Sequence, residues 1–224
     1  MEKNRQFVIF GNFAKLTFED LSVLSDLKNK YNLLMDARLD AQMMPIGQIP
    51  QYNIPIRPIF KSIDNKILVM FGTSRIFIQQ DDDSIYSFDE FVEMSLSIIE
   101  HIFKSFEISV NRIAINGSFI INDTNKISDL FKSTFKENRF NQRESDEWYV
   151  RINNVEFNHT LNTEINKIFV LNKCNTIDGF PKDFLALSYD YNTQINNTNL
   201  FDFKAIKMFV DIAKVFREYI KNIV

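Results

Sequence analysis

The sequence predicts an α+β protein made of two tandem βαβββα-like modules, residues 1–107 and 108–224, whose antiparallel strands carry long helices on one face. Three observations support this fold class. Two long segments have the apolar spacing of amphipathic helices, and several shorter segments alternate apolar and polar residues as half-buried strands do. The order strand, helix, about three strands and long helix also occurs twice. The two modules could join edge to edge as one continuous domain.

The first half opens with a predicted strand over residues 6–16, and a predicted helix begins at Thr17. Thr17 and Asp20 have the spacing of a capping box, in which side chains satisfy the free amides of a helix start. Apolar residues at helical spacing continue to Leu34 and Met35, so we expect one long helix here.

Four of the five prolines lie in residues 45–60. Proline lacks an amide hydrogen and fixes φ, so this segment is expected to be an extended connector or an edge strand and not a central strand. Residues 59–80 then predict two or three strands, with turns at Asp64–Asn65 and at Gly72.

A long helix is predicted over residues 87–106, where Ser87 and Glu90 form a capping box. Its apolar side chains fall on one face: Phe88, Phe91, Val92, Ile98, Ile99, Ile102, Phe103 and Phe106. Three charged residues should face solvent or a partner: Glu93, Glu100 and Lys104.

The second half begins with a long predicted strand over residues 108–121. Its alternation places four residues on one face: Ile108, Val110, Arg112 and Ala114. A short helix should follow, opened by Asp123 or Thr124. Three further strands are predicted, with His159 in a hairpin turn between the first two: residues 147–157, 164–174 and 183–193.

The last predicted element is a long helix over residues 199–224. Six of its residues have core spacing: Ile206, Phe209, Val210, Ala213, Phe216 and Ile220. Three others should face solvent or a partner: Lys207, Lys214 and Arg217.

Composition limits the class of protein. The net charge is −3 and the sequence pI is about 5.5, which argues against a protein that mainly neutralises phosphates. The apolar run in the first residues is too short for the core of a signal peptide, and no apolar segment approaches the length of a membrane-spanning helix. The single cysteine, Cys174, cannot form an internal disulfide. We therefore expect a cytoplasmic protein that does not enter a membrane.

No motif for catalysis or cofactor binding is present in the sequence. The chain has two histidines, His101 and His159, and neither has Cys or His neighbours at metal-ligand spacing. Phosphate-binding glycine loops and nucleophile elbows are also missing. We predict no catalytic residues, no metal and no cofactor. The acidic run Asp81, Asp82 and Asp83 has two interpretations, a metal site or a solvated turn before a helix, and the turn is the simpler one.

One aspartate lies inside a predicted strand. Alternation places Asp190 on the face opposite Leu185, Leu187, Tyr189 and Tyr191. An aspartate in a sheet needs a partner or water, and Arg112 and Arg151 on other strands are candidates. If helices cover only one face of the sheet, six polar residues could line a binding surface on the other: Asn111, Arg112, Arg151, Asn153, Ser188 and Asp190. The same residues would also suit an ordinary salt-bridged outer face.

The layout resembles a sporadically distributed, uncharacterised family of bacterial and phage proteins. The resemblance covers Tyr86 and Phe88 through "VNRIAI", a proline-bearing segment upstream, and a "SYDYN" strand before the last helix. Family members share a strand, a helix and a "tRIglRY"-like strand, and later an aspartate-bearing strand. Arg112 matches the family's arginine, whereas residues 114–116 depart from its pattern. The resemblance implies this architecture and a place in a bacterial or phage conflict or defence system.

Three functions remain open from the sequence. The leading hypothesis is a non-enzymatic binding or assembly protein, whose partner is another protein or a second copy of the chain. The first alternative is a metal-dependent hydrolase or nuclease in which Asp190 converges with the acidic run Asp81–Asp83. The second is a nucleic-acid-binding protein whose sheet face presents Tyr149, Arg151, Tyr189 and Tyr191, although the net negative charge disfavours it.

Overall fold

The computed structural model describes residues 2–16, 25–39, 56–135, 148–173, 184–195 and 200–223. In chain order the elements are β1 (Glu2–Asn12), α1 (Ser25–Lys30), β2 (Leu33–Leu39), β3 (Ile56–Ser62), β4 (Ile67–Phe71), β5 (Arg75–Asp82), α2 (Phe88–Ser105), β6 (Ser109–Ile121), α3 (Thr124–Thr134), β7 (Trp148–Asn158), β8 (Thr163–Lys173), β9 (Leu185–Thr193) and α4 (Phe203–Lys221). None of the described helices is long and apolar enough to cross a membrane.

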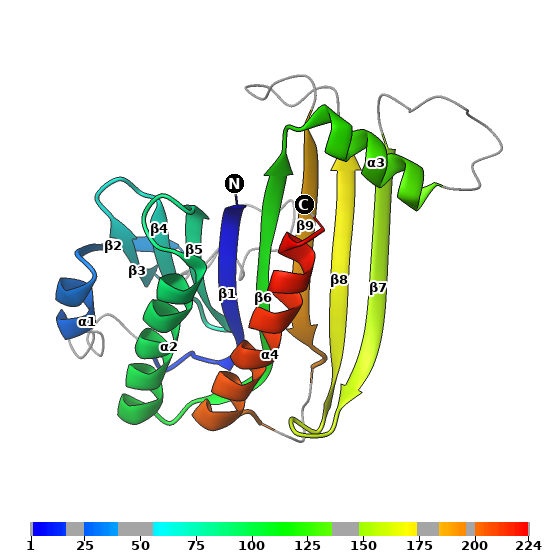
Figure 1. The fold of residues 1–224 in the computed structure, drawn as a ribbon. Coiled ribbons are helices and arrows are strands. Elements are labelled where there is room, and N and C mark those ends of the chain that lie inside the picture. Colours follow the sequence, from blue (N-terminus) through cyan, green and yellow to red (C-terminus); the bar gives the residue numbers. More distant parts are fainter. Residues whose placement is uncertain are drawn as a thin grey trace, which may run out of the picture.

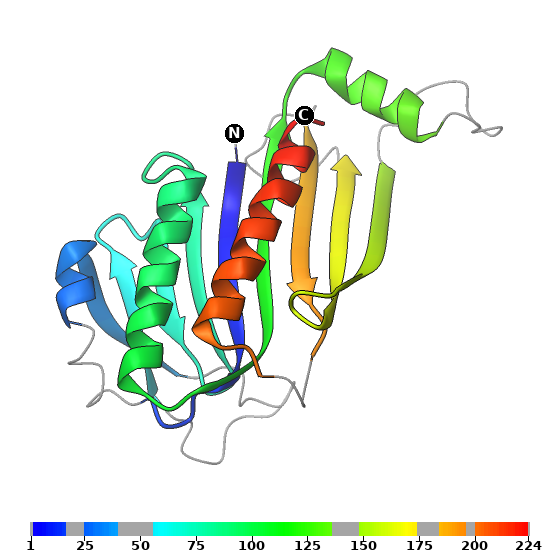
Figure 2. The ribbon, with the colours of Figure 1, turned by 60° about the horizontal axis from the view of Figure 1, so that its bottom comes forward.

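All nine strands form one antiparallel sheet in the order β2-β3-β4-β5-β1-β6-β9-β8-β7. The helices α2 and α4 lie side by side on the same face of this sheet, and α3 lies at the end of the strands of the second half (Figures 1 and 2). The protein is therefore of the predicted α+β class. We call the face opposite α2 and α4 the open face.

The two halves meet at the centre of the sheet, where β1 pairs antiparallel with β6. The second half has the predicted order of strand, helix, three strands and helix, whereas the first half has four strands after its short helix. One cluster of buried side chains includes residues of both halves, such as Phe71 and Leu185. A single core therefore lies beneath both long helices.

The predicted long helix after the first strand is wrong. Within residues 25–39, the described part of this segment, only α1 is helical, and Leu34 and Met35 lie exposed in β2. Asn32 has a positive φ of 52°, a conformation that ends helices, and the next residues pair along β3. Pairing with a neighbouring strand has overridden a helical pattern of apolar residues. The proposed cap at Thr17 and Asp20 lies outside the described residues.

The expectation for the proline-rich segment holds only in part. Most of it lies outside the described residues, but its last part forms β3, which is the second strand from the edge and not the edge itself. Pro58 pairs with Ala37 of β2, while pairing with β4 begins only at Ile59. Proline is accommodated because it lies where β3 has a neighbour on one side only.

The two long helices follow the sequence closely. In α2 the Ser87 side chain accepts the Glu90 amide and the Glu90 side chain accepts the Ser87 amide, so the capping box is confirmed. Asp202 caps α4 by accepting the Ala205 amide. The predicted stripes face the sheet, and Ile99 and Phe209 are almost completely buried.

A bulge in β6 corrects one predicted face. Phe10 of β1 pairs with Arg112 and Gly11 pairs with Val110, so Asn111 is an extra residue between them. Val110 joins the core under the helices, whereas Arg112 lies on the open face with Phe10, its guanidinium 4.9 Å from the ring centroid. Val110 and Arg112 therefore do not share a face, because the bulge breaks the alternation of side chains.

Candidate functional site

The open face carries two rows of side chains across the second half of the sheet. The pairing registers align Asn116, Asp190, Ile168 and Asn153 in one row, on β6, β9, β8 and β7. The same registers align Ser118, Ser188, Val170 and Arg151 in the adjoining row. Four of the six predicted surface residues therefore lie in adjacent rows.

A hollow of about 300 Å³ lies over these rows. Its polar lining comes from β1, β6 and β9: Asn4, Gln6, Asn116, Ser118, Ser188 and Asp190. The Ser118 and Ser188 hydroxyls are 2.8 Å apart and share a hydrogen bond. We call this hollow the Asp190 pocket.

The Asp190 carboxylate is the distinctive group of the pocket. Burial raises the pKa of Asp190, while a hydrogen bond from Asn192 and the charges of Arg112 and Arg151 act in the opposite direction. Asn192 is held in turn, because its side-chain oxygen accepts a hydrogen bond from Asn166 at 3.0 Å. Among the described residues, Asp190 Oδ1 is buried and has no hydrogen-bond partner.

Arg112 and Arg151 approach Asp190 without a direct contact. Within the part of the chain that the structure describes, neither forms an ion pair with it, although their charges act on its pKa. Arg112 Nε is also buried without a hydrogen-bond partner among those residues. The pocket therefore offers an unused acceptor, with an unused donor on the same face of the sheet.

Asn111 is the predicted surface residue that lies farthest from this arrangement along β6. It occupies the bulge, five residues from Asn116 in the strand, and it does not line the pocket. Asn153 and Arg151 lie on the edge strand β7 in the two rows and are exposed. The sequence reasoning missed the contributions of Gln6, Asn116 and Ser118, because strand neighbours are not visible in one sequence.

The carboxylates of the acidic run do not converge with Asp190. β5 and β9 are separated by β1 and β6. Asp81 accepts a hydrogen bond from Gln79, Asp82 bonds to Lys3 and Ser84, and Asp83 accepts the Glu2 amide. The described residues contain no group of three His, Cys, Asp or Glu side chains that could hold a metal. This arrangement gives the hydrolase alternative no support.

The tyrosines proposed for nucleic-acid stacking are placed differently from the prediction. Tyr189 and Tyr191 are 2% and 1% exposed and point into the core beneath the helices. Tyr191 packs on Phe209 and Phe216 of α4. Only Tyr149 is exposed, on the edge strand, so the open face has no row of stacking aromatics from these residues.

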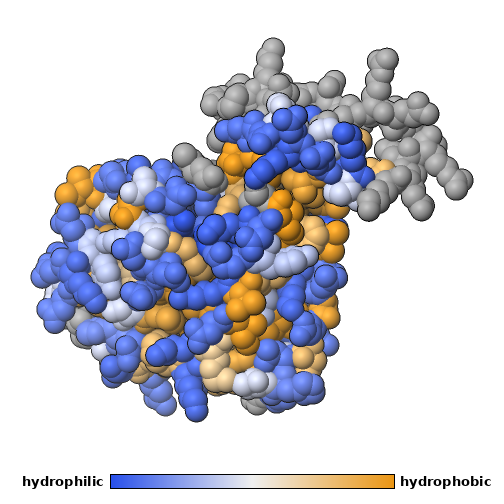
Figure 3. All heavy atoms as spheres, viewed as in Figure 1, coloured by the Kyte–Doolittle hydropathy of each residue, from blue (hydrophilic) through white to orange (hydrophobic). Residues whose placement is uncertain are grey.

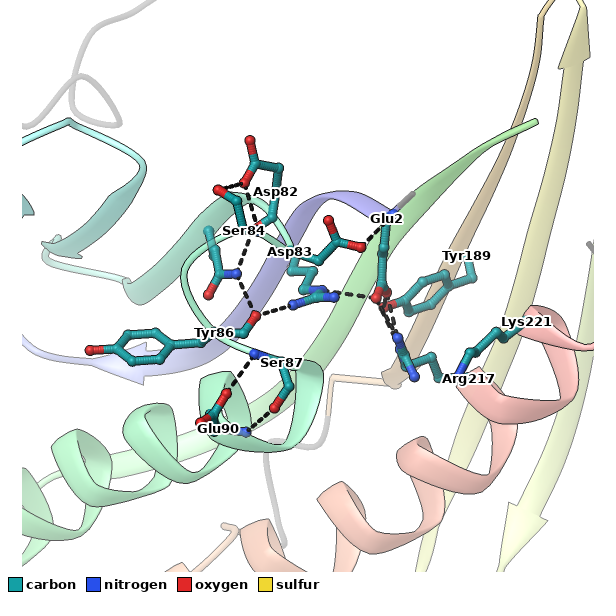
Figure 4. Close-up of polar contacts among 12 residues, drawn as sticks. Glu2, Asp82, Asp83, Ser84, Tyr86, Ser87, Glu90, Tyr189, Arg217 and Lys221 are labelled. Atoms are coloured by element: carbon teal, nitrogen blue, oxygen red, sulfur yellow. Dashed lines mark hydrogen bonds and ion pairs between the residues drawn. The ribbon is translucent and has the colours of Figure 1, made fainter. Parts of the chain in front are cut away.

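A second polar cluster, which the sequence analysis missed, lies beneath α4 (Figure 4). Glu2 is buried and accepts hydrogen bonds from the Tyr189 hydroxyl at 2.7 Å, from Arg5 Nε at 2.8 Å and from Arg217 Nε at 3.1 Å. Arg5 also donates to the Tyr86 carbonyl at 2.7 Å. Within the described residues, no buried side-chain atom of these four groups lacks a hydrogen-bond partner, so the cluster joins β1, β9 and α4 and is structural.

Arg217 was expected to face solvent or a partner, and that expectation is wrong. It is 6% exposed, and its guanidinium lies 4.1 Å from the centroid of the Phe88 ring. Arg217 follows Ala213 by four residues and precedes Ile220 by three, so its position in the buried stripe was visible in the sequence. Gly117 leaves room for Tyr189 to reach Glu2, because a Cβ there would lie 2.8 Å from the tyrosine hydroxyl.

An apolar groove of about 730 Å³ lies between α4 and β8 on the helix side. Its apolar lining includes Phe169, Ile212, Val215, Phe216 and Tyr219. Figure 3 shows apolar side chains at the surface between α3 and α4. Nothing in the described residues indicates what would occupy this groove.

Comparison of the chain with models of known protein families and with curated proteins found no match. The interpretation of the site therefore depends on its geometry.

The pKa of Asp190 predicts an effect of charge on stability. A carboxyl group with a raised folded-state pKa contributes stability below its unfolded pKa and loses it as the pH rises through the folded value. We therefore expect Asp190→Asn to raise the urea midpoint at pH 7, by an amount that shrinks toward pH 4. Ser188→Ala removes an uncharged group from the same pocket and is the control. The difference between its urea midpoint and that of the wild type should not change with pH. A lower midpoint for Asp190→Asn at pH 7 would mean that attraction to the two arginines outweighs the cost of burial.

Proposed function

We propose that the protein is a non-enzymatic binding protein that recognises a protein partner through the open face of its sheet. The observation that carries this proposal is the buried Asp190 Oδ1, which has no hydrogen-bond partner among the described residues. Buried polar atoms in native proteins are nearly always paired, because an unpaired acceptor costs about 1–3 kcal/mol. Because Oδ1 has almost no accessible surface, a partner's donor would reach it with a rotation of the Asp190 side chain toward the pocket, and would then satisfy it.

The size and lining of the pocket suggest the chemistry of the partner. A hollow of about 300 Å³ can take one large side chain, and its amides and hydroxyls supply both donors and acceptors. An asparagine, glutamine or lysine side chain would donate to Asp190. A nearby backbone carbonyl or carboxylate of the same partner would meet Arg112.

Selection from a random peptide library displayed on phage tests this proposal. Peptides enriched on the wild-type protein should share a donor residue and should bind Asp190→Ala about 10–100-fold more weakly, the value of one hydrogen bond to a charged group. Glu93→Ala, an exposed carboxylate on the helix side, is the matched control and should bind as the wild type does. Equal binding to wild type and Asp190→Ala, or no enrichment, would contradict the proposal.

We also propose that the two halves are tandem modules related by duplication. The topology supports this, because β1 and β6 meet at the centre and each half continues outward from its first strand in reverse chain order. In this scheme β5, β4 and β3 correspond to β9, β8 and β7, α2 corresponds to α4, and β2 is additional. The resemblance of the sequence to bacterial and phage proteins leads us to place the function in a cytoplasmic conflict or defence system, which the single cysteine suits.

A further inference from the structure

Among the described strands, β7 is an edge strand along its whole length. β7 pairs with β8 from Trp148↔Lys173 to Asn158↔Thr163 without a register shift, and no described strand pairs with its other edge. Eleven residues of strand present backbone donors and acceptors over roughly 35 Å. Such an edge is a template for a further strand.

The residues of β7 themselves lack features that protect edge strands. It contains no proline, no lysine and no bulge, and its only charged residues are Arg151 and Glu156. Apolar side chains are exposed instead: Tyr149 at 60%, Val155 at 51%, Phe157 at 46% and Ile152 at 38%. The opposite edge strand, β2, has seven residues, two of them charged.

We propose that β7 pairs antiparallel with β7 of a second copy of the chain, about a two-fold axis through Asn153, so that the two sheets become continuous. Asn153 is the midpoint of β7, and only this register pairs all eleven residues of both strands. A two-fold axis perpendicular to the sheet keeps the open faces of both copies on the same side.

The side chains of β7 are self-complementary in this register. Tyr149 and Phe157 lie four residues on either side of Asn153 and on the same face, so Tyr149 meets the partner's Phe157 as a cross-strand aromatic pair. Arg151 meets the partner's Val155, and Glu156 meets the partner's Val150. The two copies of Arg151 lie four positions apart along the strands, about 13 Å, so like charges are not opposed.

This self-complementarity favours a second copy over an unrelated extended peptide, which would have no reason to match the spacing of the two aromatic residues. The interface is separate from the Asp190 pocket. Asp190→Ala should therefore leave the dimer intact, so failure of one proposal does not imply failure of the other.

Sizing of the full chain by chromatography with light scattering tests the dimer, and one position tests its register. Val155→Lys places a lysine against the partner's Arg151 at both of the symmetry-related positions. The repulsion between these like charges should raise the dimer dissociation constant at least tenfold. Val155→Glu places a carboxylate there and should lower the same constant. Val155 is exposed in the single chain, so at concentrations where wild type and variants are all monomeric both variants should keep the wild-type urea midpoint.

A cysteine at the axis gives an independent readout. Asn153→Cys in a Cys174→Ser background should form a disulfide-linked dimer on air oxidation, because residues directly opposed across antiparallel strands lie within disulfide distance. A wild-type chain that stays monomeric at about 100 µM would overturn the proposal. Equal weakening by both Val155 variants, or no cross-link at residue 153, would also overturn it.

Discussion

Glu2→Ala is expected to lower the free energy of unfolding by about 3–5 kcal/mol, because it leaves Arg5 and Arg217 buried without their shared counter-charge. Both arginines are less than 10% exposed, so neither can regain full hydration without moving the chain around it. The measurement is urea unfolding at pH 7. Glu218→Ala is the matched control, because Glu218 also contacts Arg217 but is largely exposed, and it should cost less than about 1 kcal/mol.

The pH dependence of the same variant adds a second expectation. Burial acts to raise the pKa of Glu2, but the hydrogen bonds from Arg217 and Tyr189 and the charges of Arg217 and Arg5 outweigh it, so the pKa lies below its ordinary value of 4.5. A lowered carboxyl pKa contributes stability above the unfolded value and loses it as the pH falls through the folded value. The difference between wild type and Glu2→Ala should therefore narrow below pH 4.5. A loss under 1 kcal/mol at pH 7, or a constant difference with pH, would show that the cluster does not act as a buried ion network.

Ile99→Asp and Phe209→Asp are each expected to cost several kcal/mol. Ile99 of α2 and Phe209 of α4 face the sheet and are at most 1% exposed. Either substitution therefore buries a charge without a partner and removes apolar packing. The cost is a large part of the roughly 5–15 kcal/mol of net stability typical of a domain. Urea unfolding, monitored by circular dichroism, measures this cost. A variant that is already unfolded without urea would mean that the cost equals or exceeds the net stability of the protein.

Two matched substitutions on the outer faces of the same helices complete this test. Glu93 and Lys207 are exposed, and replacement of either by alanine should change the unfolding free energy by less than about 0.5 kcal/mol. A mild effect of Ile99→Asp or Phe209→Asp would contradict the packing of that helix on the sheet. A large loss of unfolding free energy in either alanine variant would mean that the outer face of that helix packs against another part of the protein.

Much of the candidate surface follows from strand alternation. Ser188 and Asp190 were assigned to the face opposite Tyr189 from the sequence, and the structure places them there because a period of two depends only on the local chain. The pocket itself could not be predicted, since Gln6 and Asn116 come from strands far away in the chain. Arg112 lies on the open face by unbroken alternation with Asn116, whereas the bulge at Asn111 moves Val110 to the helix side, which alternation alone does not indicate.

The sequence by itself determined the elements whose signals are local. Ser87 and Asp123 each supply an oxygen to free amides at a helix start, so α2 and α3 begin where their predicted caps place them. Asp202 caps α4 in the same way, so that helix begins at Phe203 and not at residue 199 as predicted. β7, β8 and β9 have alternating side chains and turn residues between them, and these patterns are read over a few residues.

Only the tertiary structure decided which segments pair and which charges are buried. Leu34 and Met35 end a helical pattern of apolar residues but lie in β2, because hydrogen bonds to β3 outweigh a small local preference. Arg217 lies in the core because Glu2 and Tyr189, more than 180 residues from each other in the chain, meet it under α4. Both outcomes depend on contacts between distant residues, whose energies are not contained in any short stretch of the sequence.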